Sequence, residues 1–200
     1  MANRVRKVAL ALAAAGSILA PSLAFAADAM QDGGNADQAH VRPMTPALRS
    51  LIARAAEASA TFRQLLQTID HSDTYVYVLE GDCGHGVRAC AGGVTPSGAR
   101  RIMRVTIALD HTPDLAAMAS IGHELRHTIE AIQDPTVRST DAQFFLYQRI
   151  GYRGTSASRE TPAAVEAGNA VRAEIRSSTR STKPESVSYT HMTLPTNREV

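Results

Sequence analysis

The sequence predicts an α+β domain in which a small antiparallel sheet packs with about four helices. Three segments, 46–70, 113–133 and 159–176, have apolar residues at three- and four-residue spacing, which is typical of amphipathic helices. Two segments between the first two helices alternate apolar and polar residues, which is typical of strands with one buried face. About 160 residues remain when both ends are set aside, which is enough for a single domain.

The first 26 residues are expected to be a secretory signal peptide. Three cationic residues between positions 4 and 7 precede an apolar stretch, Val8 to Leu19, and Ala24-Phe25-Ala26 matches the A-x-A cleavage signature. A membrane anchor is the alternative, but the apolar stretch is short and no cationic stop signal follows it. We therefore expect export to the periplasm or the medium, with no membrane anchor after cleavage.

The charge of the exported chain argues against one class of partner. The full sequence has 21 Lys and Arg against 19 Asp and Glu. Removal of residues 1–26 takes away three cations and no acidic residue, so the net charge changes from +2 to −1. This balance does not indicate binding to nucleic acid or to an anionic membrane surface.

The domain itself is expected to span residues 44–186. Residues 27–43 begin with many Gly, Asp, Asn and Gln residues and are expected to form a flexible lead-in. The tail VSYTHMTLPTN resembles the translation of a transposase adapter used in sequencing libraries, so residues 187–200 are interpreted as an assembly scar. A polar natural C-terminus is the alternative, and it would be equally irrelevant to the fold.

Local patterns predict the first half of the domain. Thr45 and Pro46 are expected to cap and open a long helix that ends near Asp70. Tyr75 to Leu79 is rich in aromatic and β-branched residues and is expected to be a strand. The turn-forming segment Gly92 to Gly98 then leads into a second strand over residues 103–109.

Three helices are expected in the second half. Thr112 and Pro113 open the first, which runs to about Gln133. The T-x-x-Q sequence at Thr140–Gln143 predicts a capping box at the start of the second. A loop over residues 152–158 precedes the last helix, which runs to about Arg176.

The two cysteines, Cys83 and Cys90, are expected to form a disulfide. They are the only cysteines of an exported chain and enclose a short loop that contains glycine. Such a bond is expected to add about 2 kcal/mol of stability. Zinc binding by both cysteines with help from His85 is the alternative, but no further cysteine is available.

The motif HELRH at positions 123–127 carries the candidate chemistry. In a helix, His123 and His127 lie one turn apart on one face, so both imidazoles can bind one Zn²⁺ ion. Glu124 lies about 100° round the helix and is suited to act as general base on a metal-activated water. Five-residue patterns of this kind also occur by chance, so the context of the motif decides.

The context favours a metal site over a pair of structural histidines. The apolar residues on the core side of this helix are Met118, Leu125, Ile129 and Ile132. On a helical wheel they point away from both histidines, as expected of a helix that buries one face and lines a cleft with the other. We therefore expect Zn²⁺ as the cofactor, held by His123, His127 and a third protein ligand.

Three carboxylates are candidates for the third ligand. Glu160 is favoured because it projects to the inner face of the last helix if that helix starts early, although Thr161 as cap and Pro162 would place it just before the helix. Glu166 is less favoured because it points outward. Glu130 lies on the histidine face of its own helix, but support of a ligand or a plain surface charge is the preferred interpretation.

The other polar residues are less informative. Tyr147 and Tyr152 can each stabilise an oxyanion, but nothing in the sequence selects either one. The remaining histidines are interpreted as unrelated surface residues: His40, His71, His85 and His111.

Three blocks of the chain, in this order, resemble a group of small exported bacterial proteins of the HExxH zinc-peptidase type. The blocks are IGHELRHTIE at residues 121–130, LYQRIG at residues 146–151 and RETPAAVEAG at residues 159–168. Those proteins share a pattern close to HELQHA-x-E, then an aromatic-rich helix that ends in IG, then ETxAA. The resemblance covers most of the exported chain.

The resemblance implies a minimal zincin-like domain with the gluzincin arrangement. His123, His127 and Glu160 are then the metal ligands and Glu124 is the catalytic base. The leading function is a zinc-dependent hydrolase, a peptidase that acts on peptide or protein substrates outside the cytoplasm. The resemblance implies little about which substrate is cleaved.

Two other functions stay open. One is a catalytically idle metal-binding or interaction domain, which differs from the enzyme in whether Glu124 faces an open cleft beside the metal. The other is an oxygen-dependent iron protein, because Glu124 and His127 also form an E-x-x-H pair. That function needs a second E-x-x-H pair on another helix, and this chain has none.

Overall fold

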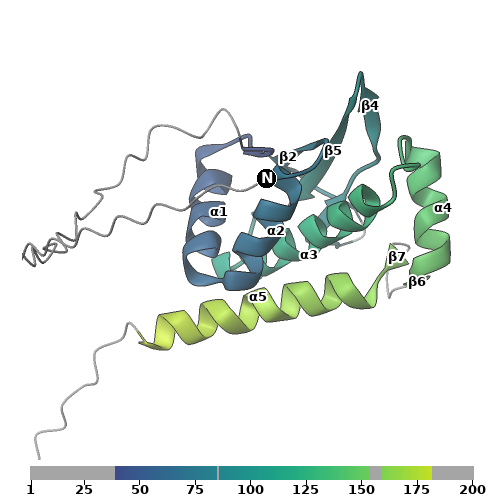
Figure 1. Cartoon of the computed structure of the whole chain (residues 1–200). Helices are drawn as coiled ribbons and strands as arrows, with labels where there is room; N and C mark the ends of the chain where they lie inside the picture. Colours follow the sequence, from purple (N-terminus) through teal and green to yellow (C-terminus); the bar gives the residue numbers. More distant parts are fainter. Residues whose placement is uncertain (1–38, 85, 154–158, 182–200) are drawn as a thin grey trace, which may run out of the picture. The chain divides into compact units, whose positions relative to one another are not determined.

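The computed structural model describes residues 39–84, 86–153 and 159–181, all within the unit Asn35–Val200 (Figure 1). The strands are β1 Val41–Pro43, β2 Thr74–Glu80, β3 Ala89–Ala91, β4 Thr95–Ser97, β5 Arg100–Ile107, β6 Tyr152–Arg153 and β7 Arg159–Glu160. The helices are α1 Pro46–Ala58, α2 Ala60–Asp70, α3 Asp114–Gln133, α4 Thr140–Ile150 and α5 Pro162–Ser181. The α+β class is confirmed.

Several expectations concern residues outside these ranges. The signal peptide over residues 1–26 and the scar over residues 187–200 lie there, as does most of the lead-in over residues 27–43. The last three residues of that lead-in form β1. No helix among the described residues is long and apolar enough to cross a membrane.

The main sheet is mixed, not antiparallel as the sequence pattern predicts. β1 pairs with β2 and β2 pairs with β5, both in parallel. β3 and β4 pair with β5 in the antiparallel sense, along its other edge. The predicted alternation of β5 is confirmed, because its residues are buried and less buried in turn. Such alternation does not specify strand direction, and residues 81–99 are long enough to return the chain for a parallel pairing.

The predicted long helix over residues 46–70 is two helices, so the described residues contain five helices against about four expected. The break falls at Ser59, whose backbone is extended and whose side chain accepts a hydrogen bond from the N–H of Phe62. The carboxylate of Glu174 on α5 accepts hydrogen bonds from the hydroxyls of Ser59 and Thr61, at 2.7 and 2.6 Å. The start of α2 is therefore held by its own cap and by α5.

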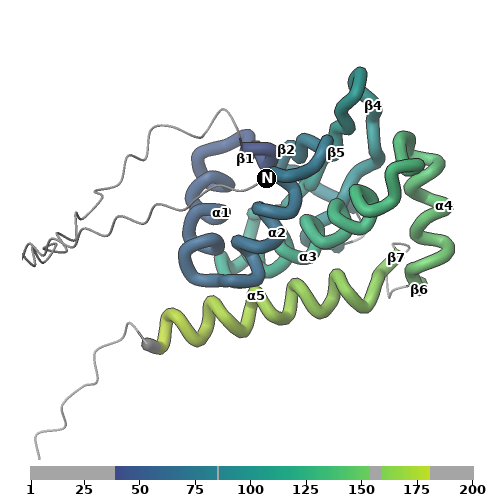
Figure 2. Tube along the Cα trace, viewed as in Figure 1, coloured from purple at the N-terminus to yellow at the C-terminus, as the bar shows by residue number. Residues whose placement is uncertain are grey.

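α3 lies between the sheet and α5 (Figures 1 and 2). Two glycines allow the two helices to approach closely. A Cβ atom at Gly122 would lie 2.9 Å from Cγ2 of Val171, and one at Gly168 would lie 3.1 Å from Cβ of His123. α5 therefore runs directly beside the HELRH turn of α3.

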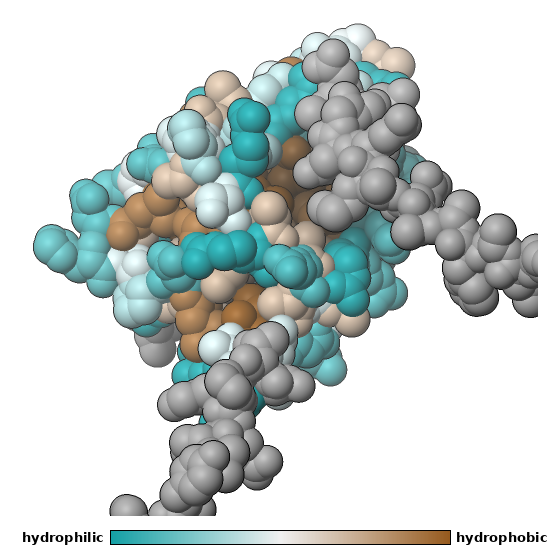
Figure 3. All heavy atoms as spheres, turned by 90° about the vertical axis from the view of Figure 1, so that its left-hand side faces the viewer, coloured by the Kyte–Doolittle hydropathy of each residue, from teal (hydrophilic) through white to brown (hydrophobic). Residues whose placement is uncertain are grey.

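The larger apolar core fills the space between the sheet and helices α1, α2, α3 and α5. The predicted apolar side of α3 is confirmed, because Leu125 and Ile129 are fully buried in this core. A smaller cluster lies under α4 and consists of Val94, Met103, Ala131, Val137 and Leu146. Figure 3 views the molecule from the left of Figure 1, and hydrophobic patches of the described residues are separated there by hydrophilic side chains.

A buried arginine, Arg101 of β5, holds the end of α3. Its guanidinium donates to the carbonyl oxygens of Ala131 at 2.9 Å and Ile132 at 3.1 Å, which lack partners within the helix. It also forms an ion pair of 2.6 Å with Asp73. Partial burial alone would raise the pKa of Asp73, but Arg101 outweighs this effect and lowers it. No local sequence pattern indicated this contact.

The capping box predicted at Thr140–Gln143 is wrong. Ser139 caps α4 instead, since its hydroxyl accepts a hydrogen bond of 3.2 Å from the N–H of Ala142. The side chain of Gln143 is buried and forms hydrogen bonds with the loop before β4. It accepts from the N–H of Val94 at 3.0 Å and donates to the carbonyl of Gly92 at 3.3 Å.

The disulfide between Cys83 and Cys90 is confirmed. It joins the segment after β2 to β3, with the two Cα atoms 6.0 Å apart. A structural disulfide is typical of proteins in an oxidising compartment. The segment that it closes, with β3, borders the pocket described next.

Candidate metal centre

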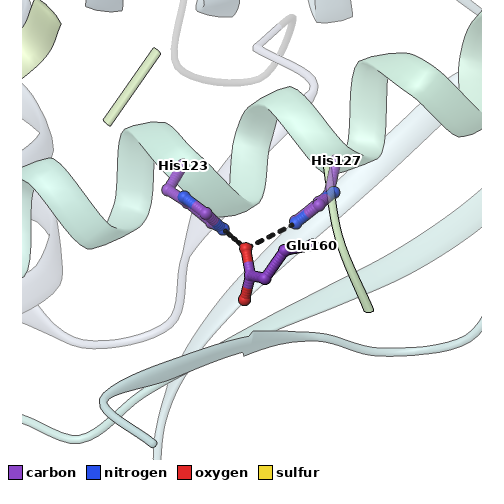
Figure 4. A group of neighbouring side chains, drawn as sticks. All are labelled: His123, His127 and Glu160. Carbon is purple, nitrogen blue, oxygen red and sulfur yellow. Dashed lines mark ion pairs between the residues drawn. The ribbon is translucent and has the colours of Figure 1, made fainter. Parts of the chain in front are cut away.

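His123, His127 and Glu160 point towards one another from α3 and β7 (Figure 4). Oε2 of Glu160 lies 3.0 Å from Nε2 of His123 and 3.8 Å from Nε2 of His127. The three potential ligand atoms all lie within 4.8 Å of one another. Ligands about 2 Å from a tetrahedral zinc ion are about 3.3 Å apart, so small movements let all three bind one ion. This group can hold a metal ion.

An unsatisfied oxygen fits this interpretation. Oε2 of Glu160 is buried and makes no hydrogen bond of good geometry with a described residue, although it lies between two imidazole rings. A buried charged oxygen without such a bond is unfavourable. The neighbouring His123 and His127 lower the pKa of Glu160 to about 2, so it is ionised. A cation among these three side chains satisfies the oxygen, and two imidazoles with one carboxylate are donors that divalent metals accept.

Glu130 supports His127 and lies outside the group of three. Its Oε2 lies 3.0 Å from Nδ1 of His127, and its Oε1 accepts a hydrogen bond of 2.6 Å from the hydroxyl of Thr161. All three side chains are buried. Burial alone would lower the pKa of His127, but Glu130 and Glu160 outweigh it and raise the pKa to about 9. A carboxylate on Nδ1 orients the ring so that Nε2 faces the metal position.

Glu160 is placed by a short two-stranded sheet and by the cap of α5. β6 and β7 pair in the antiparallel sense, with Tyr152 opposite Glu160. Thr161 follows directly, and its hydroxyl oxygen accepts a hydrogen bond of 3.1 Å from the N–H of Ala164. Pro162 is the first residue of α5. Thr161 therefore caps α5 and binds Glu130 with the same hydroxyl, which fixes the chain next to Glu160.

The sequence candidates for the third ligand take different places. Glu160 is the carboxylate that lies with both histidines, whereas Glu166 is exposed on α5. Glu130 is a buried partner of His127 and not a surface charge. The sequence offered Thr161 as a cap of the last helix, which the structure confirms. Its hydrogen bond to Glu130 had no local sequence signal, because the two residues are 31 positions apart.

Glu124 lies beside the group in a pocket of about 660 Å³. The pocket is lined by His123, Glu124 and Glu160 together with parts of α3, α5 and the segment before β3. Glu124 is only 7% exposed. Burial raises its pKa, against the opposing effects of His127 and His123. A carboxylate with a raised pKa is a stronger base than an exposed one.

The hydroxyl of Tyr147 is engaged within the protein. It donates a hydrogen bond of 2.7 Å to the backbone carbonyl of His127, and its ring makes an edge contact with that imidazole. Burial raises the pKa of Tyr147. Tyr152, the other predicted oxyanion candidate, is 48% exposed on β6. Tyr147 therefore links α4 to α3 next to His127.

The other described histidines are not part of the group. His71 and His111 are exposed, as expected, and His85 lies outside the described residues. His40 is buried, contrary to expectation, with Nδ1 3.1 Å from the carbonyl of Ile69. Comparisons with known protein families, curated proteins and solved structures gave no significant match to this chain.

Proposed function

We propose that this protein is a zinc-dependent hydrolase, a peptidase of the gluzincin type. The observation that carries the proposal is the presence of His123, His127, Glu160 and Glu124 in one site, with Glu124 open to a pocket. Two histidines and one glutamate are the protein ligands of a common class of catalytic zinc site. An adjacent carboxylate with a raised pKa is the remaining group that hydrolysis needs.

His123, His127 and Glu160 would hold the zinc ion. When bound, the ion supplies Lewis acidity, which polarises a peptide carbonyl and lowers the pKa of water. Glu124 takes one proton from the attacking water and transfers it to the amine nitrogen as the C–N bond breaks. The water oxygen ends on the carbonyl carbon, so the products are a carboxylic acid and an amine, which become a carboxylate and an ammonium group when the acid proton passes to the amine.

The pocket supports an enzyme over an idle domain. Glu124 lines an opening that is large enough for part of a peptide, next to the three candidate ligands. The site of action proposed is outside the cytoplasm. The disulfide and the signal-peptide pattern of residues 1–26 both support export.

Metal analysis and peptide hydrolysis, measured on the same variants, test the proposal. Glu124→Gln is expected to keep the zinc and to lower hydrolysis about 10²- to 10⁴-fold, because the amide has the size of the carboxylate but not its basicity. His123→Ala, His127→Ala and Glu160→Ala are each expected to lose zinc. Glu166→Ala is the matched control, because it removes an exposed carboxylate of α5.

Each alternative has its own outcome in this experiment. Zinc retained by both histidine variants would contradict the metal site. Zinc retained by Glu160→Ala but lost from Glu130→Ala or Glu166→Ala would contradict the ligand assignment. Zinc bound without hydrolysis of any peptide would favour the idle domain, and iron in place of zinc would favour an iron protein.

A further inference from the structure

The pocket contains an arginine with no partner among the described residues. Arg172 of α5 lines the pocket together with His123 and Glu160. Its Nε is inaccessible to water and makes no hydrogen bond with a described residue. By contrast, the buried guanidinium of Arg101 is fully engaged by Asp73 and by backbone carbonyls. Arg172 is therefore unusual in this molecule.

A donor of this kind is unfavourable unless a ligand accepts its hydrogen bond. A buried N–H group without an acceptor destabilises the protein, and more so when it is charged. A guanidinium has five donors in a planar fork and binds a carboxylate through two parallel hydrogen bonds. Arg172 has this fork at the wall of the pocket, with no described acceptor.

The charges around the pocket favour an anion. Its charged lining residues are Glu124, Glu160, Arg88 and Arg172, whose formal charges cancel. A divalent metal ion at the histidines would leave an excess of two positive charges. A negative group on the ligand is then attracted into the pocket, and least screened where the walls exclude water.

Arg172 lies a short distance along α5 from the metal ligands. Gly168 lies against His123, since a Cβ atom there would be 3.1 Å from Cβ of the histidine. Arg172 is four residues further on, which corresponds to about 6 Å along the helix axis. That distance is about two residues of an extended peptide. A group bound by Arg172 therefore lies in the same pocket as the bond that is cleaved.

We propose that Arg172 is a specificity-determining residue that binds a carboxylate of the peptide substrate through its guanidinium. This inference rests on the proposed function, which makes the ligand a peptide. The carboxylate is either the free C-terminus, so that a short C-terminal piece is released, or the side chain of Asp or Glu. Both sources present the same planar anion to Arg172.

Matched peptides separate the two sources of carboxylate. The first pair is an N-acetylated alanine pentapeptide with a free or an amidated C-terminus. The second pair is the amidated pentapeptide with Glu or Gln at the fourth position. We expect the zinc-loaded protein to prefer the carboxylate member of at least one pair by about 10- to 100-fold in kcat/KM. Arg172→Gln is expected to remove this preference with unchanged zinc content.

Two further variants control for charge and for folding. Arg172→Lys keeps the charge but not the fork and is expected to keep only part of the preference. Arg176→Gln removes an exposed cation one turn further along α5 and is expected to keep the preference. Equal cleavage of both members of each pair by the wild-type protein would overturn the inference, and so would a preference that survives in Arg172→Gln.

A binding measurement tests the role of Arg172 independently of the proposed peptidase activity. The four peptides are titrated calorimetrically into the zinc-loaded Glu124→Gln protein, with and without Arg172→Gln. Carboxylate binding that depends on Arg172, with no turnover by the wild type, would support the inference and contradict the peptidase. Turnover without any carboxylate preference in cleavage or binding would support the peptidase and overturn the inference.

Discussion

Glu130→Gln tests how His127 is held for metal binding. The carboxylate lies 3.0 Å from Nδ1 of His127 and accepts a 2.6 Å hydrogen bond from Thr161. Glutamine has the same shape, so Thr161 can keep an acceptor oxygen. The imidazole, however, loses its negatively charged partner. A neutral amide orients the ring less strongly and leaves Nε2 a weaker metal ligand.

Two effects of Glu130→Gln oppose each other, and pH separates them. Loss of a carboxylate behind a metal-binding histidine costs about 10- to 100-fold in metal affinity. Glu130 also helps to raise the pKa of His127 to about 9, so at pH 7 the metal must displace a proton, which lowers affinity about 100-fold. The substitution lowers that pKa and relieves the competition. The deficit in affinity is therefore expected to be largest near pH 9 and smaller at pH 7.

Competition with a fluorescent zinc chelator measures this affinity at both pH values. Glu166→Gln is the control, because it changes an exposed carboxylate on α5 by the same single group. Wild-type affinity in Glu130→Gln at pH 9 would refute the support of His127 by Glu130. A deficit that grows as the pH falls would refute the role given to the raised pKa of His127.

Two further predictions concern packing and the metal. Gly168→Ala places a Cβ atom 3.1 Å from Cβ of His123 and 3.3 Å from the carbonyl of Ala119, and we expect a loss of about 1 to 3 kcal/mol in urea unfolding. Asn169→Ala, at an exposed neighbouring position, is the control; equal stability of both variants would contradict the close approach of the helices. Removal of zinc by a chelator is expected to lower the melting temperature and leave the far-ultraviolet circular dichroism unchanged. At a free zinc concentration of 1,000 times Kd, bound zinc stabilises the folded protein by about 4 kcal/mol. Loss of helical signal on chelation would show that the protein does not keep the ligand arrangement without zinc.

Features that depend on local spacing could be predicted from the sequence. His123 and His127 share a helix face because four residues make about one helical turn. The apolar residues of α3 define its buried side by the same periodicity, and Leu125 and Ile129 are fully buried. The disulfide followed from the presence of only two cysteines in a chain expected to be exported.

Features that depend on contacts between distant segments could not be predicted in this way. Alternating apolar residues show that one face of a strand is buried but do not fix the direction of the neighbouring strand, so the antiparallel pairing that they predicted was wrong for β5 and β2. Ser59 lies within a continuous apolar pattern and breaks it through hydrogen bonds that include Glu174, 115 residues away. That Nε of Arg172 has no acceptor among the described residues follows from the packing of α5 at the pocket and not from any sequence pattern.

The candidate site depends on α5 more than the HELRH motif alone suggests. A helix with His123 and His127 provides two ligands, and the third comes from the residue two positions before α5 begins. Thr161 fixes that position because its hydroxyl binds both the start of α5 and Glu130 of α3. Gly168 allows the same helix to lie against His123, and Arg172 then reaches the pocket one turn later. Metal binding and substrate selection are thus proposed to depend on the position of the same helix, α5. A shift of α5 along α3 would therefore alter both together.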